Sequence, residues 1–353
     1  MSVFVIVYYA VLIVATCTAA YYGKRTALLL LFSLLAASFV FGLLGGESSL
    51  ITIAVIAGLL FAAGGVSYSF REFLVQIMPP NAAKVLRYAP LTASFGILMI
   101  LIYVITAVFA PVIAPFGESE VVGSPFGPPD DVMILGGDQL GRDMFSRIVY
   151  GARNTVGIAL VTTTLAFLVG TVTGLIASTM GGWVDQILGR LADILVSIPQ
   201  LIFALLLLTI LGTGIVNLTL VIALLYSPLV FRLTRSVANN IVVMDYIEAA
   251  RLRGESTWYL VVQEVLPNAA APLAAEFGLR FCFVFLAISA LSFLGLGIQP
   301  PTADWGSMVR ENATLITFGE ITPLIPAGAI ALLTVSINFV VDWLLYISSG
   351  LKE

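Results

Sequence analysis

The sequence predicts an all-α polytopic membrane protein with about nine transmembrane helices. Only 10% of the 353 residues are charged, 60% are hydrophobic, and the mean hydropathy is +1.07. In soluble domains roughly a quarter of residues are charged, and a soluble core of this length could not bury so much apolar surface. A bilayer can accept it. Helices are favoured because they satisfy their own backbone hydrogen bonds in lipid and because no alternating barrel pattern is present.

Apolar segments long enough to cross a bilayer, which takes about 20 helical residues, recur along the chain. The expected spans are 2–22, 26–44, 50–68, 91–114, 154–179, 190–212, 216–238, 269–297 and 322–347. The first segment lacks the basic start of a signal peptide and is long enough to span, so we expect it to be retained.

Lysine and arginine predict the orientation, because they accumulate in cytoplasmic loops. A set of nine basic residues falls on one side when the N-terminus is outside and the C-terminus is cytoplasmic. They are Lys24, Arg25, Arg71, Lys84, Arg87, Arg232, Arg235, Arg251 and Arg253. The opposite side then carries two long loops, 115–150 and 298–321, which hold nine of the 20 acidic residues. We therefore expect a multi-pass membrane protein with its C-terminus in the cytoplasm.

A proline pair divides the chain. Pro79 and Pro80 interrupt any helix in the segment 69–90. Three expected helices in 1–68 precede this segment, which we expect to be a cytoplasmic linker, and six expected helices follow it within 91–350. The role of the first three helices is open, and a structural addition is the simplest interpretation.

A compact charged stretch at 245–268 lies on the expected cytoplasmic side. Asp245 followed by Glu248 fits a capping box, which predicts a helix of about two turns over 246–253. Gly254 suits the left-handed position that ends a helix, and Ser256 or Thr257 can cap a second short helix. The stretch is expected to form a rigid surface rod tied to two spans. An ordinary, well-capped loop is the simpler alternative.

Residues in this stretch resemble the loop through which permeases of ABC importers dock onto their ATPase subunits. The matching residues are Glu248, Ala249, Ala250, Arg251, Gly254, Leu266 and Pro267. Three further blocks resemble the dipeptide/oligopeptide branch of that family: LGGDQLGRDMFSRIVYGAR at 135–153, GGWVDQILGRLADILVSIP at 181–199 and LSFLGLGIQPPTADWGSM at 291–308. The resemblance covers about 88–350.

The resemblance implies a multi-pass protein of a bacterial or archaeal cytoplasmic (inner) membrane. It also implies a six-helix permease core within 91–350 and a specific set of partners. These are a second permease subunit, two ABC ATPase subunits that use ATP and Mg²⁺, and a periplasmic or lipid-anchored substrate-binding protein. It implies peptide import, although similar permeases carry nickel, opines, glycosides or peptide antibiotics. A non-transport membrane scaffold or sensor built on the same fold is the alternative from another class.

Two groups of charged residues are candidates for the translocation path or its gate. Glu276 and Arg280 are four residues apart, so they share one face of the span 269–297. They are expected either to pair with each other or to place Arg280 against a peptide carboxylate. The second group is Asp185, Arg190, Asp193 and Pro199. We expect Arg190 to pair with either acid and Pro199 to kink the helix, as a stable corner or as a hinge near the cytoplasmic gate.

An outer block is the candidate docking side for the binding protein. The block is expected to lie in a solvated interfacial helix, near the loop that contains Trp305; its residues are Asp138, Gly141, Arg142, Asp143 and Arg147. Trp305 is expected to be either a docking residue or an interfacial anchor.

Several function classes are excluded by what the sequence lacks. No GxxxxGK[ST] motif is present to bind ATP, and without histidine the usual triads and zinc motifs cannot form. We therefore expect no enzyme activity, no metal and no cofactor bound by this chain. A net charge of −4 without a basic stripe argues against nucleic-acid binding.

Overall fold

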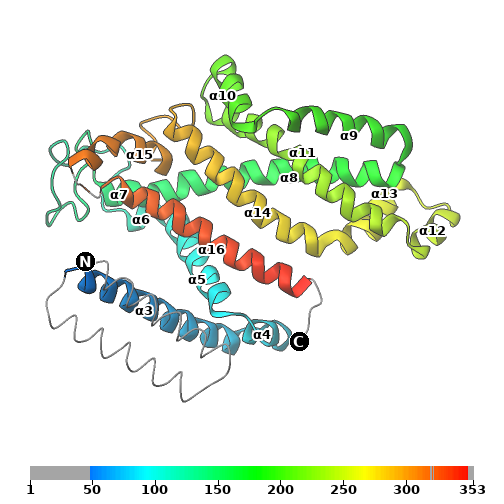
Figure 1. The fold of residues 1–353 in the computed structure, drawn as a ribbon, viewed down its shortest axis with the longest axis horizontal. Coiled ribbons are helices and arrows are strands. Elements are labelled where there is room, and N and C mark those ends of the chain that lie inside the picture. The colour runs from blue at the N-terminus through cyan, green and yellow to red at the C-terminus, as the bar shows by residue number, and fades with distance from the viewer. Residues whose placement is uncertain (1–47, 319, 321, 349–353) are drawn as a thin grey trace, which may run out of the picture. The chain divides into compact units, whose positions relative to one another are not determined.

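The computed structural model describes residues 48–318, 320 and 322–348 (Figure 1). In these residues every regular element is a helix, and the only β-type pairings are two isolated bridges. The chain divides into two compact units, 1–87 and 88–353. The expected spans 2–22 and 26–44 lie outside the described residues, so the count of nine spans stays a prediction.

The first unit contains α3 (Ser48–Ile77) and α4 (Pro80–Arg87). The third expected span lies within α3, but the helix continues nine residues past 68 because no proline or glycine interrupts it before Pro79. The segment 69–90 is mostly helical, but the helix is interrupted at Met78 and Pro79, as the proline pair predicted; its role as a cytoplasmic linker stays a prediction. Pro80 begins α4, where a missing backbone donor is tolerated.

The second unit is a helical bundle with short surface helices at both ends (Figure 1). Its elements are α5 (Leu91–Val108), α6 (Ala110–Ile113), α7 (Met144–Gly151), the π-helix η1 (Ala152–Val156), α8 (Gly157–Met180), α9 (Gly182–Ser197), α10 (Gln200–Leu211), α11 (Ile215–Val242), α12 (Asp245–Leu252), α13 (Thr257–Tyr259), the π-helix η2 (Leu260–Val265), α14 (Leu266–Phe293), α15 (Trp305–Asn312), the 3₁₀-helix η3 (Ala313–Phe318) and α16 (Leu324–Ser348).

Among the described residues, five helices are long and apolar enough to cross a membrane. The run Met144–Met180 starts ten residues before the expected span, and Thr257–Phe293 joins the expected short helix to its span. The expected span 190–212 is not one straight helix, because α9 and α10 meet at 87° and only together qualify as a sixth span. The break lies at Ile198-Pro199, which confirms the predicted kink. At 87°, the two helices lie nearly perpendicular to each other.

Small residues allow α8 and α11 to approach closely, and the two helices lie side by side (Figure 1). A Cβ added to Gly170 would lie 2.6 Å from the Ser227 carbonyl oxygen, and one added to Gly174 would lie 2.8 Å from Cβ of Thr234. Such small-xxx-small contacts bring helix backbones together in membranes, where lipid removes the hydrophobic drive for association. Helices α8, α11 and α14 form the shaft of the bundle, with α12 at one end and α7 and α15 at the other (Figure 1).

Candidate functional site

The α12 end of the bundle contains the residues that the sequence singled out for coupling. The expected two-turn helix is present as Asp245–Leu252, but it begins one residue early. Its N-cap is Met244, whose carbonyl accepts hydrogen bonds from the amides of Ile247 at 2.9 Å and Glu248 at 3.4 Å. Asp245 makes no side-chain cap, so the predicted capping box is wrong; both acids instead lie in the first turn, which favours negative charge.

One side of α12 is fixed to the shaft. Ile247 and Ala250 are fully buried and pack in a cluster with Leu175 of α8 and Val261 and Val265 of η2. Ala250 therefore faces inward, whereas Ala249 is exposed.

Arg251 adds a polar anchor for α12. It donates a hydrogen bond of 3.2 Å to the Thr179 carbonyl near the end of α8, one of the carbonyls that a helix end leaves without an intrahelical partner. This bond adds to the apolar cluster that holds α12 against α8.

The other side of α12 is exposed and mixes charge with large apolar groups. Glu248 and Ala249 are exposed, Leu252 is 83% exposed, and Trp258 just beyond is 66% exposed. Gly254 has φ +82°, which confirms its predicted left-handed conformation, and open space surrounds it. A protruding Leu and Trp beside a helix with charged ends is a typical surface for a protein partner.

The chain after α12 returns directly into a span. Ser256 caps α13 by accepting from the amide of Tyr259 at 3.2 Å, which settles the predicted choice between Ser256 and Thr257. Leu266 packs on the cluster that buries α12, and Pro267 lies in the first turn of α14, where its ring is tolerated. The predicted second short helix is thus continuous with α14, whereas the turn at 253–256 separates α12 from it.

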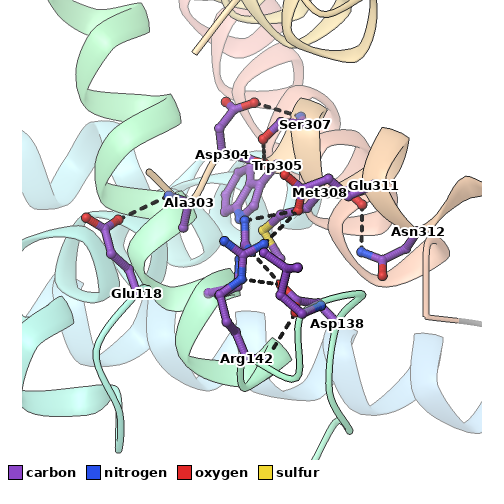
Figure 2. Close-up of polar contacts among 12 residues, drawn as sticks. Glu118, Asp138, Arg142, Ala303, Asp304, Trp305, Ser307, Met308, Glu311 and Asn312 are labelled. Carbon is purple, nitrogen blue, oxygen red and sulfur yellow. Dashed lines mark hydrogen bonds and ion pairs between the residues drawn. The ribbon is translucent and has the colours of Figure 1, made fainter. Parts of the chain in front are cut away.

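At the opposite end of the shaft, four charged side chains form a closed ring. Oδ2 of Asp138 accepts hydrogen bonds from Nε of Arg142 at 2.7 Å and from the Arg147 guanidinium. Glu311 of α15 completes the ring, 3.1 Å from Arg142 and 3.3 Å from Arg147. Their side chains are at most 4% exposed. Figure 2 shows Arg142 between Asp138 and the α15 residues. Two positive and two negative groups cancel, as buried charges require.

Further buried contacts tie the two outer loops together (Figure 2). Glu118 accepts hydrogen bonds from the Ala303 amide at 3.1 Å and from Asn154 at 2.9 Å. Asp304 caps α15 by accepting from the Ser307 amide at 2.8 Å, and it also accepts from Thr155 at 2.9 Å. Burial raises the pKa of the Asp304 carboxyl above its ordinary value.

The expected solvated character of this block is wrong. Asp138, Arg142 and Asp143 are 1–3% exposed, and Asp143 caps α7 by accepting from the Ser146 amide at 2.8 Å. Gly141, at φ +75°, lies against the carbonyl of Gly123, where a side chain would collide. The block folds inward because each charge finds its partner in the loops, which hydropathy cannot indicate.

Trp305 is not the expected interfacial anchor. Its side chain is 0% exposed, its indole donates a 3.0 Å hydrogen bond to the Ile148 carbonyl, and its ring lies on Gly151. Tyr103 and Phe285 pack edge-on against it, with ring centroids 5.6 and 6.2 Å away. Trp305 therefore joins the second loop to α5, α7 and α14 and does not present a surface to a partner.

The expected pair Glu276–Arg280 is present in α14 as a hydrogen-bonded ion pair. Glu276 is 7% exposed, and the Arg280 guanidinium also lies 5.4 Å from the Phe283 ring centroid. This geometry supports the structural interpretation, in which the two charges satisfy each other.

The second group of path candidates pairs differently from the expectation. Asp185 pairs with Arg235, and Asp193 with Arg232 at 2.6 Å, so both acids of α9 bond to α11. Arg190 is exposed and makes none of these ion pairs. Spacing along one helix suggested Arg190, but α11 lies close enough to offer better-directed guanidinium groups.

Several residues of these clusters had no signal in the sequence. Glu118 and Glu311 were assigned only to acidic outer loops, and Arg232 and Arg235 only to charge sidedness. Their partners are 36 to 185 residues away along the chain.

Comparison with known proteins identifies the class of the chain. Residues 142–350 match the family model described as binding-protein-dependent transport system inner membrane component. The chain is 35% identical over 256 residues to the di/tripeptide transport system permease protein DppC of Pseudomonas aeruginosa, covering 70% of this chain and 84% of that protein. It is 33% identical over 254 residues to the dipeptide transport system permease protein DppC of Alkalihalophilus pseudofirmus, covering 71% and 83%.

A third relative is the probable D,D-dipeptide transport system permease protein DdpC of Escherichia coli, at 31% identity over 266 residues, covering 74% of this chain and 89% of that protein. These relatives are transport permeases, which agrees with a chain whose described helices include five apolar enough to span a membrane. The resemblance found in the sequence is confirmed. The chain therefore belongs to the family of binding-protein-dependent transport system inner membrane components, multi-pass proteins of the inner membrane.

Proposed function

We propose that this chain is the permease subunit of an ATP-driven importer of di- or oligopeptides. It forms half of the translocation path, and a second permease subunit forms the other half. The relatives named above as dipeptide and peptide permeases support peptides as the substrate class. The chain binds no cofactor of its own, because ATP and Mg²⁺ are used by two partner ATPase subunits.

An ATPase subunit acts on the exposed side of α12. The exposure of side chains on this side of a helix that is otherwise packed on the bundle is the observation that carries the proposal. A partner can contact the exposed side chains of Glu248, Leu252 and Trp258. If it displaces α12, the buried Ile247 and Ala250 transmit that displacement to the shaft. The Arg251 bond to Thr179 and the cluster with η2 make α12 rigid relative to α8 and α14. A force at α12 is thereby passed to two spans at once.

The topology that fits this role has the N-terminus outside, with α12 and the C-terminus in the cytoplasm. The excess of lysine and arginine on the α12 side supports it. The opposite end then faces the substrate-binding protein. There the buried ring and Trp305 hold the outer loops in one shape, and the loop surface, not the ring itself, meets the binding protein.

The proposal is tested on the assembled complex in proteoliposomes with its binding protein. Purification through this chain is expected to recover an ATPase, and Glu248→Arg is expected to abolish ATP-dependent uptake of a dipeptide because it reverses a charge on the docking side. Asp131→Arg is the matched control, since Asp131 is exposed at the other end and its reversal leaves ATPase recovery unchanged. Normal coupled uptake by the Glu248→Arg complex would disprove the role of α12.

A further inference from the structure

One face of α9 carries a line of exposed polar side chains. Gln186, Arg190, Asp193 and Ser197 are all exposed, and their spacing of four, three and four residues places them on one stripe of the helix. A neighbouring stripe is apolar and equally open: Ile187 is 48%, Leu191 53% and Ile194 61% exposed. The helix therefore has two different outer faces beside the one that packs on α11.

The facing part of α11 continues the polar line. The exposed side chains at helical spacing are Arg232, Ser236 and Asn239, whereas the neighbouring Val230, Thr234 and Ala238 are buried. The ion pair between Arg232 and Asp193 joins the stripes of the two helices, and the Arg235–Asp185 pair joins them a second time. The two stripes thus form one surface, the α9–α11 polar strip: Gln186, Arg190, Asp193, Ser197, Arg232, Ser236 and Asn239.

The two charged residues that join the strip lie well inside their helices, away from the ends nearest the α12 side. Arg232 is ten residues from the end of α11 at Val242, or roughly 15 Å along the helix. Asp193 is eleven residues from the start of α9, or roughly 16 Å. Their side chains are 48% and 66% exposed, so neither is covered by this chain. Charged groups at such depth face water or protein, because hydrocarbon disfavours them strongly.

We propose that the α9–α11 polar strip lines a water-filled inner half of the translocation path, and that Asp193 and Arg232 attract the two charged ends of a passing peptide. A peptide is a zwitterion with an ammonium at one end and a carboxylate at the other. Asp193 offers a carboxylate to the first and Arg232 a guanidinium to the second, and the open ion pair can exchange partners. The substrate class rests on the proposed function, whereas the water exposure of the strip does not.

Water exposure is measured with single cysteines in the full complex, after Cys17 and Cys282 have been replaced by alanine. Inside-out vesicles are treated with a membrane-impermeant methanethiosulfonate, which reacts with the thiolate that forms in water. Cysteines at Gln186, Ser197 and Ser236 are expected to react several-fold faster than matched cysteines at Ile187, Leu191 and Ile194.

The charge pair is tested by neutralising it while keeping groups that can still hydrogen-bond. The double variant Asp193→Asn with Arg232→Gln is expected to lower uptake of dialanine several-fold and to leave ATP hydrolysis by the complex intact. The control is Asp185→Asn with Arg235→Gln, the less exposed pair, for which a smaller effect on uptake is expected.

The outcomes separate the two proposals. Equal labelling of both stripes, or no labelling of the polar one, overturns the strip as a path surface, whatever the complex transports. Fast labelling of the polar stripe with undiminished dialanine uptake in the first double variant overturns the role of the charge pair. If the complex takes up no peptide at all while the labelling pattern holds, the peptide function fails and the water-filled strip stands.

Discussion

The two ends of the bundle use charged residues in opposite ways. At the α15 end, Asp138, Arg142, Arg147 and Glu311 turn inward and pair in a ring that is at most 4% exposed. At the α12 end, Glu248 and Arg253 stay exposed on a helix held by apolar contacts and one backbone bond. The buried ring at the α15 end therefore fixes the shape of the loops, whereas the exposed charges at the α12 end are free to contact another protein.

The largest expected effect comes from breaking the ring. Arg147→Met leaves Asp138 and Glu311 buried with one guanidinium between them, and removing one partner of a buried pair typically costs about 3–5 kcal/mol. The melting temperature of the purified protein in detergent should fall sharply. Arg153→Met, an exposed arginine six residues along, is the control and should leave the melting temperature unchanged. Equal melting temperatures for both variants would mean that the ring does not hold the loops.

A smaller loss is expected from the shaft that connects the two ends. In Gly170→Ala, the new methyl would lie 2.6 Å from the Ser227 carbonyl oxygen and force α8 away from α11. Overpacking of this kind costs about 1–3 kcal/mol. Gly189→Ala in α9 meets open space, so its higher helix propensity should stabilise by up to about 1 kcal/mol. A lower melting temperature for Gly170→Ala and a higher one for Gly189→Ala would confirm the close packing. A change of the same sign in both variants would contradict it.

Asp304 at the ringed end should contribute about 1 kcal/mol through its helix cap, measured as the loss of stability in Asp304→Ala. The Asp304 carboxyl should also make the folding stability depend on pH. Because its pKa is raised by burial, the folded protein binds this proton more tightly than the unfolded chain does. Stability therefore falls as pH rises from its ordinary pKa of 3.8 through the raised value. Asp304→Asn keeps a capping group that cannot ionise, so melting curves across pH should lose this component.

The smallest effect on stability is expected at the α12 surface. Leu252→Ser changes a side chain that is 83% exposed, and such surface substitutions usually stay within about 0.5 kcal/mol. Dipeptide uptake should nevertheless fall, because an apolar contact to the ATPase is lost. Ile247→Ser is the matched comparison: it buries an unpaired hydroxyl in place of a core side chain, and should lower the melting temperature as well as uptake.

The sequence predicted the two ends unequally well, for physical reasons. The α12 helix, Gly254 and the Ser256 cap follow from local rules, because each depends on neighbours within a turn or two. The shift of the N-cap from Asp245 to Met244 shows the limit of such rules: a backbone carbonyl can start a helix where a side chain was expected.

The ringed end depends on distant residues, and there the prediction failed. Arg142 and Glu311 are 169 residues apart along the chain, and no periodicity relates them. A charged loop reads as solvated unless its partner is known, so Asp138 and Trp305 were assigned to the surface. Arg190 was likewise expected to pair with Asp185 or Asp193, because spacing within α9 cannot identify the partners on α11.

Direct contact between α12 and an ATPase subunit is the claim on which the account depends. The measurement is disulfide or bifunctional cross-linking in the assembled complex, with a single cysteine at Leu252 and paired cysteines on the ATPase, and with a single cysteine at Asp131 as the reference for the opposite end. The account predicts that the Leu252 cysteine links to the ATPase, that its yield changes when ATP binds, and that the Asp131 cysteine does not link. ATPase cross-links from Asp131, with none from Leu252, would contradict the account.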